Sequence, residues 1–179
     1  MKEKNTLKSE FIKFLDKTPL PKDIVHFQNI VDYKSPFYFD DLFQLLEMSH
    51  FRSEIKHNPD VGVNHADVFS HVFEIFNVRR HPKINSLHEQ LASVFHKNSD
   101  DKNFRPDIFT SFKSSMGNPH SDHEDVCIIG LCGSTYYSFP HLQKVYEVSE
   151  GGAIYIPKGT PHAAHSFSRR MVVSWSRFL

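Results

Sequence analysis

The feature that most constrains the fold is a change in sequence pattern near residue 100. After the polar segment 97–103, the chain consists of short runs rich in β-branched and aromatic residues, and glycine and proline punctuate these runs. Several short strands with this punctuation are typical of a β-sandwich or a β-barrel. The runs are DIFTSF, DVCIIGL, STYYSF, KVYEV, AIYIP and MVVSWS. The sequence therefore predicts a β-structured core over residues 101–179.

The pattern before residue 100 is mainly helical. Apolar side chains recur at helical spacing in four segments, which are residues 7–15, 39–48, 65–76 and 86–95. In the last of these segments, Ser86 and Glu89 form the S-x-x-E pattern of a capping box, so we expect a helix to begin at Ser86. Residues 1–100 are thus predicted to form a helical N-terminal region that packs on the β core.

Composition argues against several classes of protein. Lys and Arg together number 21, as do Asp and Glu, so the formal net charge is zero. A nucleic-acid partner is not favoured, because a surface that binds one usually carries a basic patch. The start of the chain lacks the apolar segment of a secretory signal, and no stretch approaches the roughly 20 apolar residues of a membrane span. The two cysteines, Cys127 and Cys132, are too few for a disulfide framework. We therefore expect a cytoplasmic protein that does not bind a membrane.

The segment NPHSDHEDVCIIGLCG carries the first candidate metal ligands. His120 and Asp122 are two residues apart, and residues i and i+2 of an extended strand point to the same face. Both side chains can therefore reach one ion. The H-x-D pattern is short, and the chain contains 13 histidines, so the pattern can easily occur by chance. A further ligand from elsewhere in the sequence is needed to support a metal site.

A second segment, GGAIYIPKGTPHAAHS, supplies that further ligand. Gly151, Pro157, Gly159 and His162 form the pattern G-x5-P-x-G-x2-H, in which a Pro-x-Gly turn directly follows a β-rich run. Such a turn makes a tight corner, which presents His162 to the interior of a barrel.

Two imidazoles and one carboxylate on one side of an ion leave its other coordination positions open. This arrangement is the facial triad of non-haem Fe(II) oxygenases. No CxxC pattern lies nearby, which argues against a structural zinc site. We predict that His120, Asp122 and His162 bind a metal ion, Fe(II) in this interpretation, and are the catalytic residues.

Together the two segments resemble the cupin-like branch of the 2-oxoglutarate oxygenases, which includes the JmjC-type hydroxylases and the ribosomal-protein oxygenases. The resemblance is sharp over residues 118–165 and looser around FYFDDLFQLL. It implies an α+β fold with a double-stranded β-helix (cupin or jelly-roll) core and a helical N-terminal half. A complete core of this type needs eight strands, so we expect residues 1–100 to contribute one or two, with residues 24–30 as a candidate.

The same resemblance implies Fe(II) as cofactor, 2-oxoglutarate as co-substrate, and hydroxylation of an unactivated C–H bond with O2. The substrate is unknown and is a protein side chain or a small molecule. A homodimer is compatible with the sequence.

The sequence departs from the family pattern at one position. The family usually places Lys or Arg two residues after the glycine that closes the H-x-D strand, where it pairs with the distal carboxylate of 2-oxoglutarate. Here that glycine is Gly133 and the following position is Thr135. A buried carboxylate needs a cation or several hydrogen bonds. Another residue must therefore bind the co-substrate, or 2-oxoglutarate is not used.

Arg169 and Arg170 are the first candidates for this role, because in other 2-oxoglutarate oxygenases an arginine opens the strand after the distal histidine. Strand alternation allows only one of them to point inward, and we favour Arg169 because it shares a face with Trp175. Lys113 is a further candidate cation. The hydroxyl groups of Thr135 and Tyr136 are candidates for additional hydrogen bonds.

Two other interpretations remain open. The first is a metal-dependent cupin enzyme that does not use 2-oxoglutarate, such as a dioxygenase, isomerase or lyase. The uncharged Thr135 supports it, whereas the H-x-D pattern argues against it, because those cupins usually use three histidines and a glutamate. The second is a non-catalytic cupin binding module, which the intact set of ligands disfavours.

Overall fold

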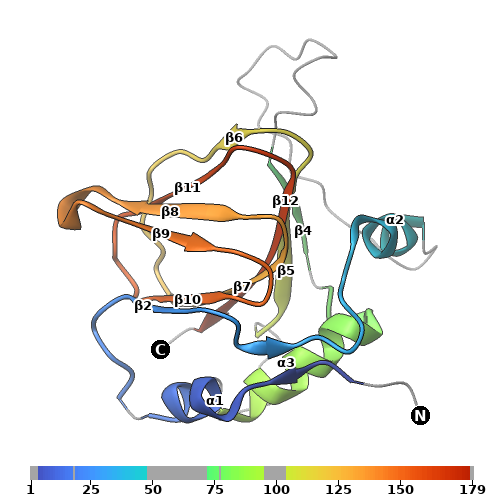
Figure 1. The fold of residues 1–179 in the computed structure, drawn as a ribbon. Coiled ribbons are helices and arrows are strands. Elements are labelled where there is room, and N and C mark those ends of the chain that lie inside the picture. The colour runs from blue at the N-terminus through green and yellow to red at the C-terminus, as the bar shows by residue number, and fades with distance from the viewer. Residues whose placement is uncertain (1–3, 18, 48–71, 77, 95–103, 178–179) are drawn as a thin grey trace.

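The computed structural model of the protein describes residues 4–17, 19–47, 72–76, 78–94 and 104–177. Two antiparallel β-sheets face each other, and three helices lie outside them in the described part of the chain (Figure 1). We call the larger sheet the major sheet and the smaller one the minor sheet. This arrangement is that of a cupin or jelly-roll fold.

The major sheet has six strands within the described residues. From one edge to the other they are β2 (Val25–Phe27), β10 (Ala153–Ile156), β7 (Asp125–Cys132), β12 (Arg170–Arg177), β5 (Pro106–Ser111) and β4 (Phe73–Ile75). The two edge strands, β2 and β4, come from the first hundred residues, and β2 lies within the segment 24–30.

The minor sheet has four strands within the described residues. In spatial order they are β6 (Ser115–Met116), β11 (Ala163–Ser166), β8 (Thr135–Phe139) and β9 (Lys144–Val148). The 3-10 helix η3 (Pro140–Leu142) connects β8 to β9. The segment after β6 continues alongside the segment before β11, and this extension carries the candidate metal ligands.

Strand β7 is almost entirely apolar because both of its faces are buried, as is typical of a strand covered on both sides. Val126 and Ile128 pack in the core between the two sheets. Cys127 and Ile129 alternate with them and pack in a second core, on the outer side of the major sheet. The fold therefore has two hydrophobic cores that share the major sheet.

The helical layer covers the outer side of the major sheet (Figure 1). Its elements are β1 (Thr6–Leu7), α1 (Ser9–Leu15), β3 (Val31–Asp32), α2 (Phe39–Glu47), η2 (Val78–Arg80) and α3 (Pro82–Val94). Phe14 of α1 contacts Tyr155 of β10 with ring centroids 5.5 Å apart. None of the described helices combines the length and the apolar character needed to cross a membrane.

Two local predictions are wrong. Residues 73–75, expected within a helix, form the edge strand β4, and the earlier part of that segment lies outside the described residues. Its apolar positions fit both helical and strand periods, and pairing with β5, which buries Ile75, selects the strand.

The start of the fourth predicted helix is also misplaced. Helix α3 begins at Pro82, whose fixed φ and missing N–H suit the first helical position. Ser86 therefore lies inside the helix, where its hydroxyl donates to the carbonyl of Lys83 at 3.0 Å. In their described part the first hundred residues contain four strands as well as three helices, and a helical N-terminal half is not confirmed.

Candidate metal centre

His120 and His162 lie opposite each other on neighbouring antiparallel segments. The backbone N–H of each donates to the carbonyl of the other, and both N···O distances are 2.9 Å. Residues paired in this way direct their side chains to the same face of the ladder. The two imidazole rings consequently lie close together, with centroids 4.5 Å apart.

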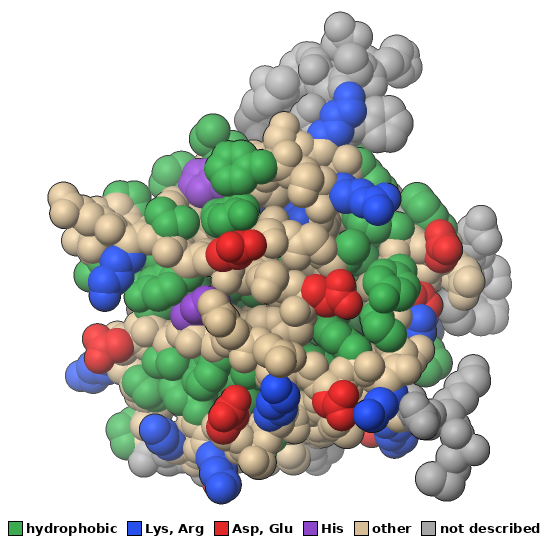
Figure 2. Space-filling view, viewed as in Figure 1, with side chains coloured by type: hydrophobic (Ala, Val, Ile, Leu, Met, Phe, Trp, Pro, Cys, Tyr) green, Lys and Arg blue, Asp and Glu red, His purple; other side chains and the backbone are tan. Residues whose placement is uncertain are grey.

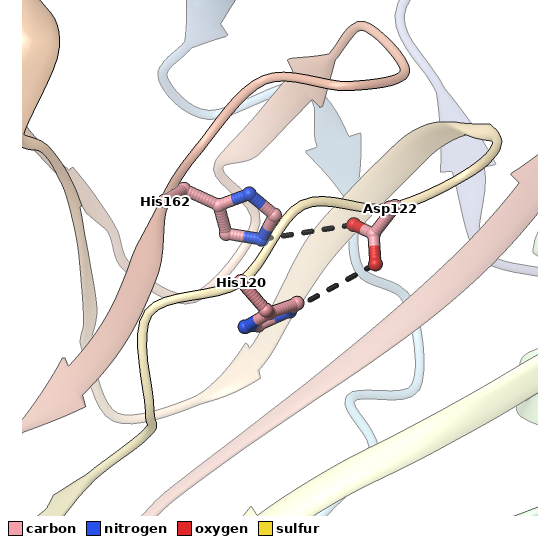
Figure 3. Close-up of side chains that lie close together, drawn as sticks. All are labelled: His120, Asp122 and His162. Atoms are coloured by element: carbon pink, nitrogen blue, oxygen red, sulfur yellow. Dashed lines mark ion pairs between the residues drawn. The ribbon is translucent and has the colours of Figure 1, made fainter.

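Asp122 faces both imidazoles (Figure 3). Its Oδ1 lies 3.8 Å from Nε2 of His120, and its Oδ2 lies 3.7 Å from Nε2 of His162. The three candidate ligand atoms are all within 4.8 Å of one another. Among the described residues, this is the only group of three or more His, Cys, Asp or Glu side chains with such a spacing.

Backbone carbonyls orient the two rings. Nδ1 of His120 lies 2.8 Å from the carbonyl oxygen of Asn118, and Nδ1 of His162 lies 3.0 Å from that of Thr160. Because a carbonyl oxygen only accepts hydrogen bonds, each Nδ1 carries the proton and donates. In the neutral rings Nε2 then presents a lone pair to the Asp122 carboxylate. Three electron-pair donors converge on one point, which is an arrangement that a cation stabilises.

Burial lowers the pKa of His162, which is 3% exposed, and so favours the neutral imidazole that a metal ion requires. His120 is more open, with a side chain 53% exposed. The site thus has one ligand in the protein interior and one at the surface.

A tight turn places His162. Gly159 adopts φ +74°, a conformation that side-chain-bearing residues rarely take, and its N–H donates to the carbonyl of Asp122 at 2.8 Å. The preceding N–H, from Lys158, donates to Oδ1 of Asp125 at 3.0 Å. The Pro-x-Gly turn of the sequence motif is therefore docked directly onto the segment that carries Asp122.

The donor set fits a metal ion. Metal–ligand bonds of about 2.0–2.2 Å bring neighbouring ligand atoms to roughly 3 Å from each other, so small side-chain rotations suffice to close the site. The three ligands border a cavity of about 520 Å³, which leaves the other coordination positions accessible. Two imidazoles and one carboxylate in this open arrangement suit Fe(II) and similar ions. A structural zinc site would instead be closed by four protein ligands.

A buried arginine lines the same cavity. Arg170 is 2% exposed, its Nη1 donates weakly to the carbonyl of Phe109 at 3.5 Å, and its Nε has no hydrogen-bond partner. A buried guanidinium with an unused donor is suited to bind an anion. Tyr137 of β8 also lines the cavity. Burial raises the pKa of Tyr137 to about 12. The charge of Arg170 lowers this pKa and that of Asp122 raises it, so the hydroxyl lies within electrostatic range of both groups.

The preference for Arg169 as the inward arginine is wrong. Arg169 is exposed and its guanidinium lies over the ring of Phe39, 5.6 Å from the centroid. Arg169 and Arg170 do point to opposite faces of β12, but the face that contains Trp175 is the outer face of the major sheet, covered by α3. The cavity receives the alternate face, which carries Arg170 and Ser174.

The other predicted co-substrate residues occupy different environments. Thr135 is fully buried and its hydroxyl has no partner. Tyr136 instead lies on the outer face of the minor sheet, where it contacts Phe167 in a hollow that Met116 also lines; Figure 2 shows hydrophobic side chains gathered over this sheet. Lys113 is exposed and is not among the residues that line the metal-site cavity.

Sequence reasoning missed Tyr137. The signal was present, because Thr135 and Tyr137 are two residues apart on β8 and hence share its inward face. The structure brings together His120, Asp122, His162, Arg170 and Tyr137 around one cavity. It directs Arg169, Tyr136 and Lys113 elsewhere.

No family model matches the chain, and no curated protein matches it in sequence. Solved structures do match. A crystal structure of the Escherichia coli ribosomal oxygenase YcfD is 19% identical over 99% of this chain, with a TM-score of 0.67. The complex of YcfD with cobalt and 2-oxoglutarate is 19% identical over 98% of this chain, with a TM-score of 0.67. The complex with cobalt and succinic acid is 19% identical over 98% of this chain, with a TM-score of 0.68.

This chain spans about half the length of those structures, 53–54% of each. At such low identity the similarity establishes the fold. The resemblance to cupin-like oxygenases that the two sequence motifs carry is therefore confirmed at the level of the fold.

Proposed function

We propose that this protein is an Fe(II)- and 2-oxoglutarate-dependent oxygenase of the cupin-like, JmjC-related type, and that it hydroxylates its substrate. One observation carries the proposal. Two imidazole lone pairs and a carboxylate converge beside a cavity that also contains a buried guanidinium with an unused donor. A metal that binds a dicarboxylate co-substrate requires these two features together.

Each residue has a defined part in the proposal. His120, Asp122 and His162 hold Fe(II), and the carbonyls of Asn118 and Thr160 keep both rings in the correct tautomer. Arg170 pairs with the distal carboxylate of 2-oxoglutarate in place of the basic residue that the family has at the position of Thr135. When bound, iron, 2-oxoglutarate and O2 supply the oxidising chemistry that converts a C–H bond into an alcohol, with release of succinate and CO2.

The walls of the cavity suit this chemistry. Val126, Ile128 and Phe109 line it with apolar surface, which limits the access of water to the reacting groups. In the proposal the hydroxyl group of Tyr137, which lines the cavity, adds a hydrogen bond to the co-substrate carboxylate, and the buried Thr135 hydroxyl on the same face of β8 is a second donor only if the co-substrate reaches beyond the cavity. The substrate is a protein side chain or a small molecule. The proposal also includes a cytoplasmic location and a homodimer as the assembly to test.

The decisive experiment combines binding with turnover. Under anaerobic conditions, 2-oxoglutarate should raise the melting temperature of the protein only when Fe(II) or Co(II) is present. In air, the Fe(II) form should release succinate from 2-oxoglutarate, and a substrate from a panel should increase the rate. Metal binding without any effect of 2-oxoglutarate would instead indicate a metal-dependent cupin enzyme of another kind. Absence of metal binding would indicate a non-catalytic binding module.

A further inference from the structure

The carboxylate of Asp125 is buried close to the metal centre without being one of its ligands. Asp125 is the first residue of β7 and is 4% exposed. Burying a carboxylate is unfavourable unless hydrogen bonds compensate for the lost water. Its Oδ1 accepts a hydrogen bond from the backbone N–H of Lys158, a residue far away in sequence, at 3.0 Å.

This hydrogen bond reaches the turn that carries His162. The next N–H of the turn, from Gly159, donates to the backbone carbonyl of Asp122 at 2.8 Å. Two successive amides of the turn are thus anchored on the segment 122–125, one of them by a side chain and the other by backbone. The side-chain anchor is the one that a substitution can remove without changing the backbone of the turn.

The anchored turn also determines how the His162 ring is oriented. The N–H of Thr160 donates to the carbonyl of Pro157 at 3.2 Å, and the carbonyl of Thr160 accepts from Nδ1 of His162 at 3.0 Å. A displacement of the turn would therefore move the carbonyl that fixes the His162 ring. It would also change the distance between His162 and Asp122.

We propose that Asp125 is a positioning residue of the metal centre. Its carboxylate holds the 157–159 turn against the segment that carries Asp122, so that both ligands stay within reach of one ion. The inference rests on the proposed function, because it presumes that the triad binds a metal. It assigns Asp125 no contact with the metal or the substrate.

Co(II) titration of the metal-free protein tests the assignment, with calorimetry for the affinity and visible absorption for the coordination geometry. Asp125→Ala removes the acceptor and should weaken Co(II) binding about 10- to 100-fold, the usual range for residues that support metal ligands. Asp125→Asn keeps an oxygen at the same place and should stay within about threefold of the wild type. Asp125→Glu keeps the charge but moves the oxygen by one methylene group, and should resemble Asp125→Ala. His123→Ala alters an exposed side chain of the same segment and should have no effect.

The outcomes separate positioning from folding. A changed Co(II) absorption spectrum in Asp125→Ala, at saturating metal, supports positioning. Lower thermal stability of the metal-free variant with unchanged Co(II) affinity and spectrum overturns it. Equal weakening by Asp125→Asn and Asp125→Ala also overturns it, because the hydrogen bond would then not be the cause.

Two further outcomes keep the test decisive. If Asp125→Ala does not fold, the comparison of Asp125→Asn with Asp125→Glu gives the answer. If the wild type binds Co(II) and Asp125→Ala binds it equally well, only the role of Asp125 fails and the proposed function stands. If the wild type does not bind Co(II), both proposals fail.

Discussion

Trp175 donates its indole N–H to Nδ1 of His88 across the interface between the major sheet and α3, at 3.2 Å. Trp175 is completely buried, and His88 also stacks on Phe104 with ring centroids 5.4 Å apart. The acceptor must be an unprotonated Nδ1, so the contact requires a ring without a proton on that nitrogen. The packing of α3 against the major sheet therefore depends on the protonation state of one histidine.

Stability should consequently fall in mildly acidic solution. Burial, and then the charge of Arg79, lowers the pKa of His88 below its ordinary value of 6.5; burial likewise lowers that of His81. Between the lowered pKa and 6.5 the unfolded chain binds more protons than the native protein. The stability contribution is therefore complete above about pH 6.5 and is lost as the pH falls through the native pKa, by at most about 1.4 kcal/mol per pH unit for each site.

Urea unfolding at pH values from 7.5 to 5.5 measures this dependence. His88→Asn keeps an acceptor but cannot titrate, so its free energy of unfolding should vary less with pH than that of the wild type. His141→Asn, an exposed control, should retain the full slope. An unchanged slope in His88→Asn would show that His88 is not a source of the effect.

Removing the carboxylate ligand should abolish metal binding. Asp122→Ala leaves two imidazoles without the charged group that faces both of them, and we expect its Co(II)-dependent rise in melting temperature to disappear. Succinate formation with Fe(II) should disappear too. Full succinate formation by Asp122→Ala would contradict the assignment of the centre.

The two neighbouring arginines should differ sharply in their effect on 2-oxoglutarate. Arg170→Leu removes the buried guanidinium from the cavity and should weaken 2-oxoglutarate binding roughly 30-fold or more, as expected for loss of one partner of a buried charge pair. Arg169→Leu changes only an exposed side chain and should leave the affinity within about twofold. Calorimetry with the Co(II) form measures both, and equal effects of the two variants would exclude Arg170 as the specific carboxylate partner.

A partly buried ion pair joins α2 to α3 and should be important for stability. Lys83 Nζ lies 2.7 and 2.8 Å from the two oxygens of Asp41 and donates to the carbonyl of Pro36 at 2.8 Å. Lys83→Met leaves the Asp41 carboxylate with the backbone N–H of Tyr38 but without its lysine, and because Lys83 is partly exposed we expect a loss of about 1.5–3 kcal/mol. Lys4→Met breaks an exposed pair with Glu89 and should cause no measurable change.

Urea unfolding of Lys83→Met, Lys4→Met, Asp41→Asn and the double variant Asp41→Asn/Lys83→Met tests the ion pair. The double variant should be less destabilised than the sum of its single variants, because no unpaired charge remains in it. Strict additivity would show that the two groups do not interact.

The convergence of the three candidate metal ligands was predictable because its determinants are local. The two-residue spacing of His120 and Asp122 and the Pro-x-Gly turn before His162 both act over a few residues, and the structure brings all three side chains together. The inward arginine was not predictable in the same way. Alternation along β12 separates Arg169 from Arg170, but which face points inward depends on which side of the major sheet the helices cover.

The errors in the first hundred residues have a related origin. Val72, Phe73 and Phe76 fit a helical stripe, and only the presence of β5 alongside makes the strand β4 favourable. The start of α3 was misplaced by four residues, because a proline at the first helical position competed with a capping-box pattern inside the helix. In both cases the sequence pattern was compatible with two local structures; pairing with β5 selected the strand, and the proline selected the start of the helix.

The reciprocal pairing of His120 and His162 has a consequence for folding. A bound cation would cross-link two segments that are distant in sequence. Such a cross-link lowers the entropy of the unfolded chain only if the cation stays bound to both segments after unfolding. The lone pairs do not converge in the unfolded chain, so the ion leaves when the ladder opens. Metal binding would therefore stabilise only those states of the protein in which the ladder between these two segments has formed.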